Sequence, residues 1–409
     1  MHYILFEDFS HFDLLPFCFT RPVFALRSGI FTVQERWEKA LSQKVYSLAY
    51  HYLSKKFSDL PTDSGQVIWI NGKFSPNEEL LQLLKEISPN QAYLNENEEV
   101  LAFSTEKIEA ALPFSDNLLD KEKLASFSLQ KVTFSPIALR KLPDIFLNNA
   151  KLIQYDFSLI TKNRTSQKIN DRFSAIYGED NIFVEEGVKV RAAVLNAEDG
   201  LLYLGKGVDI QEGAMIHGNH AFCDYSVANM GAKMRGDSTV GPYSKVGGEI
   251  GNSVIMGYSN KGHDGYLGNS VLGYWCNLGA DTNTSNLKNT YEKVKIWNYV
   301  RKGFENTGQQ FCGLMMGDHS KCGINTMFNT GTVVGVASNI FGDGFPRNFL
   351  PDFTWGGAAG ITTHQLKKAF QTAEAVMGRR GLVFDETERE ILTTVLELTK
   401  EFRSWEQAQ

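Results

Sequence analysis

The residues with the clearest chemical potential lie in a polar, glycine-rich run near the middle of the chain. His263 stands within residues 260–268, NKGHDGYLG, and a second polar run, CNLGADTNTSN, follows at 276–286. An imidazole titrates near neutral pH and can act as a general base. A single loop histidine is also common on ordinary protein surfaces, so a purely structural interpretation stays open.

A repeat of six residues sets the elements that must position these side chains. Starting at Leu204, every sixth residue is apolar as far as Val246. The residues four positions further on, from Val208 to Ile250, are mostly small or β-branched, and Gly, Asp, Asn and Glu lie between them. A period of six matches neither an α-helix nor a simple alternating strand.

Short strands separated by tight turns do fit this period. Three such units would close a triangular coil, and coils would stack at about 4.8 Å with apolar ladders inside. Glycines would allow corners with positive φ. We therefore predict a left-handed parallel β-helix over residues 181–356. An ordinary β-sandwich is the alternative, which the unbroken hexads disfavour.

The repeat is interrupted once. Its register continues through apolar residues between Ile255 and Leu278 and resumes at 316–317, 334–335 and Ile340. The intervening residues 286–313 predict a protruding loop, in which residues 293–297 alternate like an exposed strand.

The flanking parts have other patterns. Residues 1–155 alternate apolar strands with helical segments, and Thr32 with Glu35 forms a capping box, so we predict an open, Rossmann-like α/β domain. Ligands of such a sheet lie at the carboxyl ends of its strands. A polar connector follows at 156–180. Two apolar stripes in 357–409 predict a helical hairpin, with caps at Thr362 and Asp385.

Composition excludes some classes of partner. The net charge of −6 argues against nucleic acid and against an anionic membrane. The five cysteines are odd in number and lack metal-site spacing, so we expect free thiols. The first residues do not form a signal peptide, and no run is apolar enough to span a bilayer. We expect a cytoplasmic protein.

The segment from His263 to Gly268, followed by Asn277-Leu-Gly-Ala280 and Asn286, resembles a known family. It is similar to the acetyltransferase half of the bifunctional UDP-N-acetylglucosamine pyrophosphorylase / glucosamine-1-phosphate N-acetyltransferase family. The stretch from Gly248 to Gly342, which includes residues 317–321 and 323–325, resembles the branch of that family described as sugar nucleotidyltransferases. The resemblance implies acyl transfer from acetyl-CoA to the amine of an amino-sugar phosphate.

The resemblance also implies roles for residues near the histidine. His263 would deprotonate the amine, Asn286 would support His263, and the backbone of Ala280 would stabilise the oxyanion at the thioester. Tyr266 and Asn277 would contact the sugar phosphate.

Three further positions concern the sugar and its phosphate. Glu249 matches a family acid near the sugar, and Arg235 matches a phosphate-binding arginine. A second basic residue of the family falls at Gly251, and Lys261 is the expected substitute.

The N-terminal part resembles the nucleotidyltransferase half of the same family at Leu15-Pro16 and Thr20-Arg21-Pro22. It departs from that pattern because no glycine precedes Gly29 and because Asn71-Gly72 replaces the Gly-Asp that holds Mg²⁺. Backbone amides and a metal carry most of the charge stabilisation in phosphoryl transfer.

Substitutes for these missing groups are available in the N-terminal sequence. Arg21 and Arg27 are the expected nucleotide-binding residues, and Asp8 is the expected metal ligand. Two arginines that only tie down a loop are the alternative.

We therefore expect a two-domain sugar-phosphate transferase. Acyl transfer from acetyl-CoA would occur on the β-helix, and nucleotidyl transfer from UTP with Mg²⁺, or a relic of it, on the N-terminal domain. The family's shared acyl site predicts a homotrimer. Two alternatives stay open: a nucleotidyltransferase whose β-helix is only a trimerisation scaffold, and a non-catalytic sugar-nucleotide-binding protein.

Overall fold

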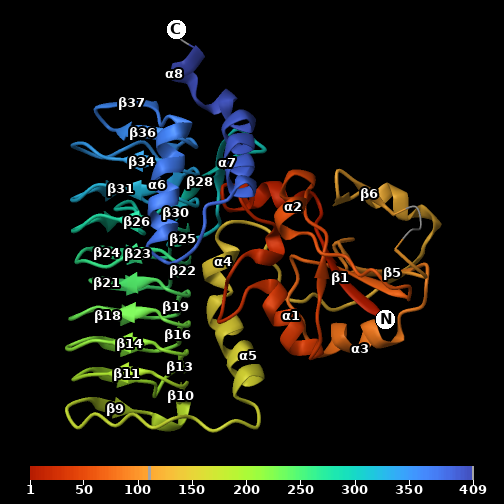
Figure 1. Cartoon of the computed structure of the whole chain (residues 1–409), viewed down its shortest axis with the longest axis horizontal. Coiled ribbons are helices and arrows are strands. Elements are labelled where there is room, and N and C mark those ends of the chain that lie inside the picture. The colour runs from red at the N-terminus through yellow and green to blue at the C-terminus, as the bar shows by residue number, and fades with distance from the viewer. Residues whose placement is uncertain (109–111, 408–409) are drawn as a thin grey trace. The chain divides into compact units, whose positions relative to one another are not determined.

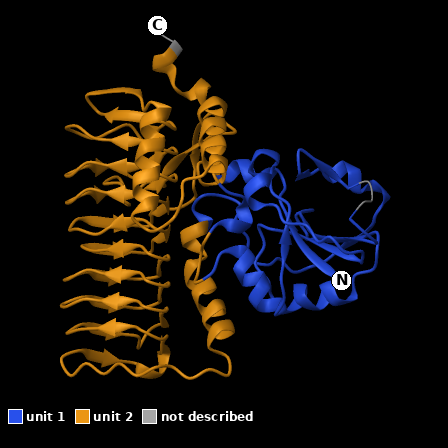
Figure 2. Ribbon diagram, in the orientation of Figure 1, with its two compact units in different colours: residues 1–14, 21–26, 31–144 blue, residues 15–20, 27–30, 145–409 orange. Residues whose placement is uncertain are grey.

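The chain forms two compact units in the computed structural model, which describes residues 1–108 and 112–407. Residues 1–14, 21–26 and 31–144 make the first unit, and residues 15–20, 27–30 and 145–409 make the second (Figure 2). The predicted order of an α/β part, a parallel β-helix and C-terminal helices is confirmed (Figure 1). The domain boundaries at 155, 180 and 356 remain predictions, because compactness alone does not show which segments fold independently.

The first unit is built on a mixed sheet in the order β2-β1-β3-β5-β4-β8. β1 runs parallel to β2 and β3, β5 is antiparallel to β3 and β4, and β8 is parallel to β4. In chain order the strands are β1 (His2–Phe6), β2 (Tyr46–Ser47), β3 (Val67–Asn71), β4 (Gln91–Leu94), β5 (Val100–Thr105) and β8 (Ser128–Lys131). β6 (Phe114–Ser115) and β7 (Leu118–Leu119) form a small hairpin.

The first helix of this unit begins where the sequence predicts. Thr32 caps α1 (Val33–Leu41): its hydroxyl accepts from the Glu35 amide and its own amide donates to the Glu35 carboxylate, so the capping box is confirmed. Asn77 caps α3 (Glu78–Glu86), and α2 (Ser54–Phe57) is a single turn.

The second unit contains the β-helix, whose strands stack coil upon coil along three faces (Figure 1). Each face is named here by its first and last strand in chain order. The β10–β35 face contains β10 (Ile182–Val184), β13 (Leu202–Leu204), β16 (His220–Phe222), β19 (Ser238–Val240), β22 (Val254–Gly257), β25 (Val271–Tyr274), β30 (Met315–Met316), β33 (Val333–Val334) and β35 (Phe349–Leu350).

The other two faces have the same construction. The β11–β37 face contains β11 (Lys189–Val190), β14 (Asp209–Ile210), β17 (Val227–Ala228), β20 (Lys245–Val246), β23 (Asn260–Lys261), β26 (Asn277–Leu278), β31 (Lys321–Cys322), β34 (Asn339–Ile340), β36 (Thr354–Gly357) and β37 (Gly360–Thr363). The β9–β24 face contains β9 (Ala175–Tyr177), β12 (Val194–Asn196), β15 (Met215–His217), β18 (Lys233–Arg235), β21 (Glu249–Gly251) and β24 (Tyr266–Gly268). β27 (Asn283–Thr284) pairs with β32 (Met327–Phe328).

The predicted hexad residues fill the interior of the β-helix. None of the eight residues spaced by six from Leu204 to Val246 is more than 1% exposed. Parallel pairing places equivalent positions directly above one another, so that Ile216 pairs with Met234 and Met234 with Ile250. Because each coil repeats the register of the last, the apolar side chains form continuous ladders.

One corner of the β-helix departs from the expected glycine turns. Tyr225, Tyr243, Tyr258, Trp275 and His319 all have positive φ there. Left-handed backbone costs a non-glycine residue about 1–2 kcal/mol. Consecutive rings stack, with centroids 5.0, 5.1, 4.4 and 6.3 Å apart, which offsets part of that cost. We call these five residues the aromatic ladder.

The interruption of the repeat is a hairpin. β28 (Lys295–Asn298) pairs antiparallel with β29 (Gly303–Asn306), so the strand expected near 293–297 is confirmed within a protruding segment.

Helices flank the β-helix at both ends of its sequence. α4 (Asp144–Leu147) and α5 (Asn149–Thr161) precede it, and α5 crosses the start of the predicted connector. The C-terminal hairpin of α6 (Leu366–Gly378) and α7 (Glu386–Leu398) is confirmed, and α8 (Ser404–Gln407) follows. Asp385 caps α7 as predicted, but the expected cap at Thr362 is wrong because Thr362 pairs with Trp355 in β37.

Two further expectations concern free thiols and membrane-spanning segments. All five cysteines are buried and free, as expected. Within residues 1–108 and 112–407 we find no helix whose length and hydrophobicity suit a bilayer crossing.

The apolar ladder inside the β-helix predicts that two neighbouring residues of β15 contribute very differently to stability. Ile216 is 1% exposed and Met215 is 46% exposed. Ile216→Ala should lower the free energy of unfolding by about 2–5 kcal/mol through the cavity it leaves. Met215→Ala should change it by about 0.5 kcal/mol or less. Urea denaturation followed by circular dichroism measures both, and equal losses would contradict the inward placement of Ile216.

Candidate active site

His263 lies on a tight turn at the corner between the β11–β37 face and the β9–β24 face. The turn joins β23 to β24, and the His263 side chain is exposed. Gly265 has φ of 107°, and a Cβ there would collide with the carbonyl oxygen of Thr282 in the next coil. The turn therefore packs tightly against its neighbour while the imidazole remains accessible.

Lys261 holds this turn from inside the β-helix. Its side chain is fully buried at an inward position, in register with Val246 of the preceding coil. Its Nζ donates to the carbonyl oxygens of His263 (2.6 Å) and Asp264 (2.9 Å). Lys261 is thus directed inward to the backbone, which corrects the expectation that it contacts a substrate phosphate.

Four of the expected residues gather on the β9–β24 face. Glu249 pairs with Tyr266 across β21 and β24, and Arg235 Nη1 lies 3.4 Å from Glu249 Oε1. Asn286 Nδ2 donates to Tyr266 Oη (3.0 Å). Burial raises the pKa of Tyr266, so its phenol stays protonated and can donate to a ligand. We call Arg235, Glu249, Tyr266 and Asn286 the tyrosine cluster.

Asn286 does not support His263 as expected. The Tyr266 amide donates to Asn283 Oδ1 (2.9 Å), which sets β27 over β24. Asn286 lies just after β27, beside Asn269 at the end of β24, whereas His263 lies before β24 begins. The two N–H donors of Asn286 are taken by Tyr266 and by Asn269 Oδ1 (2.8 Å), so Asn286 fixes the tyrosine rather than the histidine.

Asn277 and Ala280 lie on the other side of the histidine corner. Asn277 is in β26 of the β11–β37 face, where its Oδ1 accepts from Asn260 Nδ2 at 3.4 Å. Ala280 lies in the turn that follows β26, one coil beyond the turn of His263, and its carbonyl oxygen accepts from the Asn325 amide (2.8 Å). Asn277 and the tyrosine cluster therefore belong to different faces.

A cationic cavity of about 360 Å³ opens beside Asn277. Its walls come from the β11–β37 face, the aromatic ladder and α6, and they include no carboxylate: Lys245, Tyr258, Asn260, Trp275, Cys276, Asn277, Lys321, Val376, Arg379 and Arg380. Burial lowers the pKa of Lys321 to about 8. The Oδ1 of Asn260 is buried and accepts no hydrogen bond from the described part of the chain.

Sequence reasoning missed this α6 cavity. Its four cations come from β20, β31 and the end of α6, which are far apart in the chain. The dipeptide Arg379-Arg380 was the one local signal, and nothing in it indicates which face of the β-helix it covers.

In the first unit, Asp8 is part of an ion-pair network. Asp8 Oδ2 accepts from Lys73 Nζ (2.8 Å) and from Asn71 Nδ2 (2.8 Å). Lys73 also meets Glu99 at 3.0 Å, and Arg140 binds Glu99 through both Nε and Nη2. Burial alone would raise the pKa of Glu99, but the hydrogen bonds from Arg140, Asn95 and Lys73 lower it to about 2.

This network does not fit the expected Mg²⁺ site. The ammonium of Lys73 occupies the side of Asp8 where a cation would bind, and Asn71 takes the same oxygen. Among residues 1–108 and 112–407 no group of three His, Cys, Asp or Glu side chains is arranged to hold a metal. The sequence indicates the loss of a carboxylate at Asn71-Gly72, but it does not predict that the adjacent Lys73 pairs with Asp8.

The two expected nucleotide-binding arginines are both buried. Arg21 is 9% exposed in the first unit. Arg27 belongs to the second unit, where its guanidinium donates to the carbonyl of Ile30 and lies 3.9 Å from Cys223 Sγ. Arg27 therefore ties down a loop, the alternative role, and the structure does not expose it to a nucleotide.

Comparison with known proteins gives a family match for the N-terminal part of the chain. Residues 3–165 match the family model described as sugar nucleotidyl transferase.

Individual relatives sharpen this class. Over 160 residues, the chain is 28% identical to a bifunctional sugar-1-phosphate nucleotidylyltransferase/acetyltransferase of Sulfurisphaera tokodaii, covering 39% of this chain and 37% of that protein. It is 37% identical over 87 residues to the bifunctional protein GlmU of Methanocaldococcus jannaschii, covering 21% of each. The matches span between about a fifth and two fifths of these relatives. They confirm the resemblance to bifunctional transferases.

Solved structures with some likeness are an acetyltransferase and an acyltransferase by title. The polySia-specific acetyltransferase NeuO gives a TM-score of 0.27 at 15% identity, covering 48% of this chain and 85% of that one. A UDP-N-acetylglucosamine acyltransferase of Arabidopsis gives 0.21 at 15% identity, covering 54% and 79%. Since these scores are low, the fold assignment rests on the strand pairing described above.

The buried lysine predicts a pH dependence of stability. Burial lowers the pKa of Lys261 from 10.5 to about 8. Between these values the unfolded chain binds more protons than the folded one, so the free energy of unfolding should rise with pH across this window. Lys261→Met should remove this contribution.

The measurement is the difference in unfolding free energy between wild type and Lys261→Met at several values from pH 7.5 to about 10.5. Lys189→Met, at an exposed position of the same face, is the matched control and should give a constant difference. A constant difference for Lys261→Met as well would show that Lys261 is charged when folded.

Proposed function

We propose that this protein is a transferase of sugar phosphates that carries out CoA-dependent N-acyl transfer to an amino-sugar 1-phosphate on its β-helix. One observation carries the proposal: an exposed His263, on a turn anchored from within, lies at the corner between the tyrosine cluster and the cationic α6 cavity. A base flanked by hydrogen-bond donors and anion-binding groups suits an amine that bears a phosphate.

The reaction would use His263 as a general base. The ammonium of the amino sugar has no lone pair, so His263 takes one proton as the nitrogen attacks the carbonyl carbon of the thioester. A C–N bond forms and the C–S bond breaks, and the second proton that the nitrogen loses goes to the thiolate of CoA, which leaves as the thiol. The amide N–H of Ala280 would donate to the oxygen that becomes negative during attack.

The tyrosine cluster and the cavity would bind the acceptor. Tyr266, held by Asn286, would donate its hydroxyl to the sugar phosphate, and Glu249 would accept from a sugar hydroxyl. Arg235 would meet the phosphate. The cations near Asn277 would supply the charge that Gly251 lacks and that the buried Lys261 cannot give.

The proposal includes a homotrimer, which the geometry of the faces supports. Tyr266 projects from the β9–β24 face and Asn277 from the β11–β37 face. Outward side chains on adjacent faces of a triangular prism diverge, so one copy cannot enclose a ligand with both. A neighbouring copy related by threefold symmetry can bring its Asn277 to the tyrosine cluster.

We assign nucleotidyl transfer to a sugar 1-phosphate, from UTP, to the N-terminal part, in active or vestigial form. The family match of residues 3–165 supports this assignment, and the ion pair between Asp8 and Lys73 favours the vestigial form. The proposed compartment is the cytoplasm, in keeping with five free thiols.

Two alternatives make different measurements come out positive. A nucleotidyltransferase with a scaffold β-helix would release pyrophosphate from UTP and a sugar 1-phosphate but release no CoA from acetyl-CoA. A non-catalytic sugar-nucleotide-binding protein would release neither.

The central prediction concerns His263. With acetyl-CoA and glucosamine 1-phosphate, His263→Ala should lower the rate of CoA release about 10²–10⁴-fold, because the general base is lost. The rate of CoA release is measured with a reagent that reacts with the free thiol of CoA. His217→Ala, which removes an exposed histidine of β15, should keep wild-type activity. Wild-type protein that releases no CoA with any amino-sugar phosphate would overturn the proposal.

The shared site predicts complementation between inactive variants. Tyr266→Ala and Asn277→Ala homotrimers should each be strongly impaired. Unfolded and refolded together in equal amounts, they should regain about a quarter of wild-type CoA release, since random mixing restores one site in four. No activity should return when Tyr266→Ala is mixed with the variant that carries both Tyr266→Ala and Asn277→Ala, because no copy then supplies Tyr266. A monomer by ultracentrifugation, or no recovery from the first mixture, would contradict a site shared between copies.

A further inference from the structure

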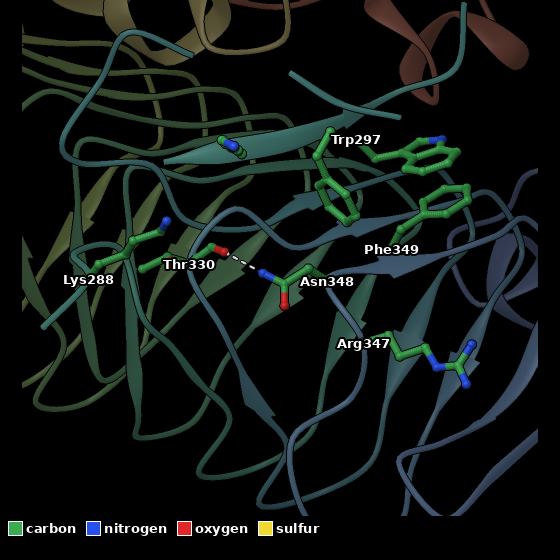
Figure 3. Close-up of a pocket in the computed structure, with 8 residues that line it drawn as sticks. Lys288, Trp297, Thr330, Arg347, Asn348 and Phe349 are labelled. Carbon is green, nitrogen blue, oxygen red and sulfur yellow. Dashed lines mark hydrogen bonds between the residues drawn. The ribbon is translucent and has the colours of Figure 1, made fainter. Parts of the chain in front are cut away.

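The hairpin inserted into the β-helix forms one side of a second cavity, of about 590 Å³ (Figure 3). Its lining residues are Lys288, Lys295, Trp297, Phe304, Thr330, Arg347, Asn348 and Phe349, all in the second unit. None belongs to the tyrosine cluster or the α6 cavity. Sites for small molecules commonly have volumes of about 300–1,000 Å³. We call this space the hairpin cavity.

The hairpin cavity is positively charged in a protein of net charge −6. Three cations line it and no carboxylate does. Lys288 lies 3.5 Å from Glu292, whereas Lys295 and Arg347 have no ion-pair partner in the described ranges. Two cations without counter-ions favour an anionic ligand, and the guanidinium of Arg347 matches the geometry of phosphate oxygens.

Aromatic rings form its apolar wall. The indole of Trp297 stacks on Phe349 with centroids 4.2 Å apart (Figure 3). Phe304 packs edge-on against the indole. The Nε1 of Trp297 is buried and finds no acceptor within the described residues. A planar ring of a ligand could contact this wall, since nucleobases stack favourably on aromatic side chains.

Polar groups beside the aromatic rings could orient a ligand in the cavity. Asn348 Nδ2 donates to the carbonyl oxygen of Thr330 (2.7 Å), the dashed line in Figure 3. This bond fixes the amide and leaves its Oδ1 as an acceptor for a ligand N–H. The hairpin itself is anchored: Val294 is fully buried, and Tyr299 Oη donates to Asp352 Oδ2 (2.8 Å). The cavity is therefore preformed rather than made by a free loop.

We propose that the hairpin cavity binds a nucleoside diphosphate group. The diphosphate lies against Lys288, Lys295 and Arg347, and the base lies against the aromatic wall with an N–H toward Asn348. This site does not depend on acyl transfer at His263. The same group occurs in free UDP, in UDP-N-acetylglucosamine and, as its adenine counterpart, in coenzyme A, so the experiment must separate these three sources.

Calorimetric titration of the full-length chain tests the proposal. UDP, UDP-N-acetylglucosamine and coenzyme A are titrated separately, and uridine and inorganic pyrophosphate serve as the two halves of the group. At least one of the first three should bind, with both halves about tenfold weaker or more, because neither combines charge with ring contact. Binding should quench tryptophan fluorescence.

Variants locate the site. Lys295→Ala with Arg347→Ala should weaken binding about tenfold or more, and Trp297→Leu should remove the fluorescence change. Arg301→Ala is the matched control, because Arg301 lies on the same hairpin, 70% exposed, 3.7 Å from Glu305 and outside the cavity. An unchanged urea midpoint shows that each variant is folded.

Nucleotide bound elsewhere, including by residues 3–165, would be unaffected by these variants. Unchanged affinity and stoichiometry in the Lys295→Ala, Arg347→Ala protein would therefore overturn the proposal. Equal affinity for pyrophosphate and UDP would overturn it too, because the aromatic wall would then contribute nothing. Failure of all three nucleotide ligands to bind would do the same.

Discussion

The rest of the β-helix depends on the parallel hydrogen bonding between successive coils. Each strand pairs with the equivalent strand of the next coil, as in the series Ile216, Met234, Ile250 and Leu267. This register makes ladders inside the prism and also outside it, where Lys233, Glu249 and Tyr266 are stacked. A side chain's chemistry therefore follows from its position in the repeat: outward residues can meet a ligand, and inward residues can only hold the coil together.

Lys261 shows how strictly this constraint applies. It occupies the inward position of β23, so its ammonium is desolvated and is directed to two carbonyl oxygens of the turn above it. The role of Lys261 is therefore structural, but it also supports the candidate active site, because the turn that it holds carries His263. A charge inside the β-helix is acceptable there because both of its hydrogen bonds are made to backbone groups that the turn would otherwise leave unsatisfied.

Charge is distributed unevenly over this acidic protein. In the first unit, Lys73 and Arg140 neutralise Asp8 and Glu99, so the carboxylates that might hold a metal are already paired. In the second unit, cations line both cavities, and no carboxylate belongs to the lining of either. This contrast supports binding of phosphate-bearing ligands by the β-helix and weakens the case for metal-assisted chemistry at Asp8.

The sequence by itself determined the β-helix, its inward ladder, the hairpin strand, the capped helices α1 and α7, and the likeness around His263. These features depend on periodicity and local hydrogen bonds, which act between residues close in the chain. The tertiary structure alone decided that Lys261 points inward, that Asn286 holds Tyr266, that Arg27 ties down a loop and that Arg379 and Arg380 line one cavity with Lys321. Those outcomes depend on stacking between coils and on packing between distant segments, and no local pattern encodes which side chains such packing brings together.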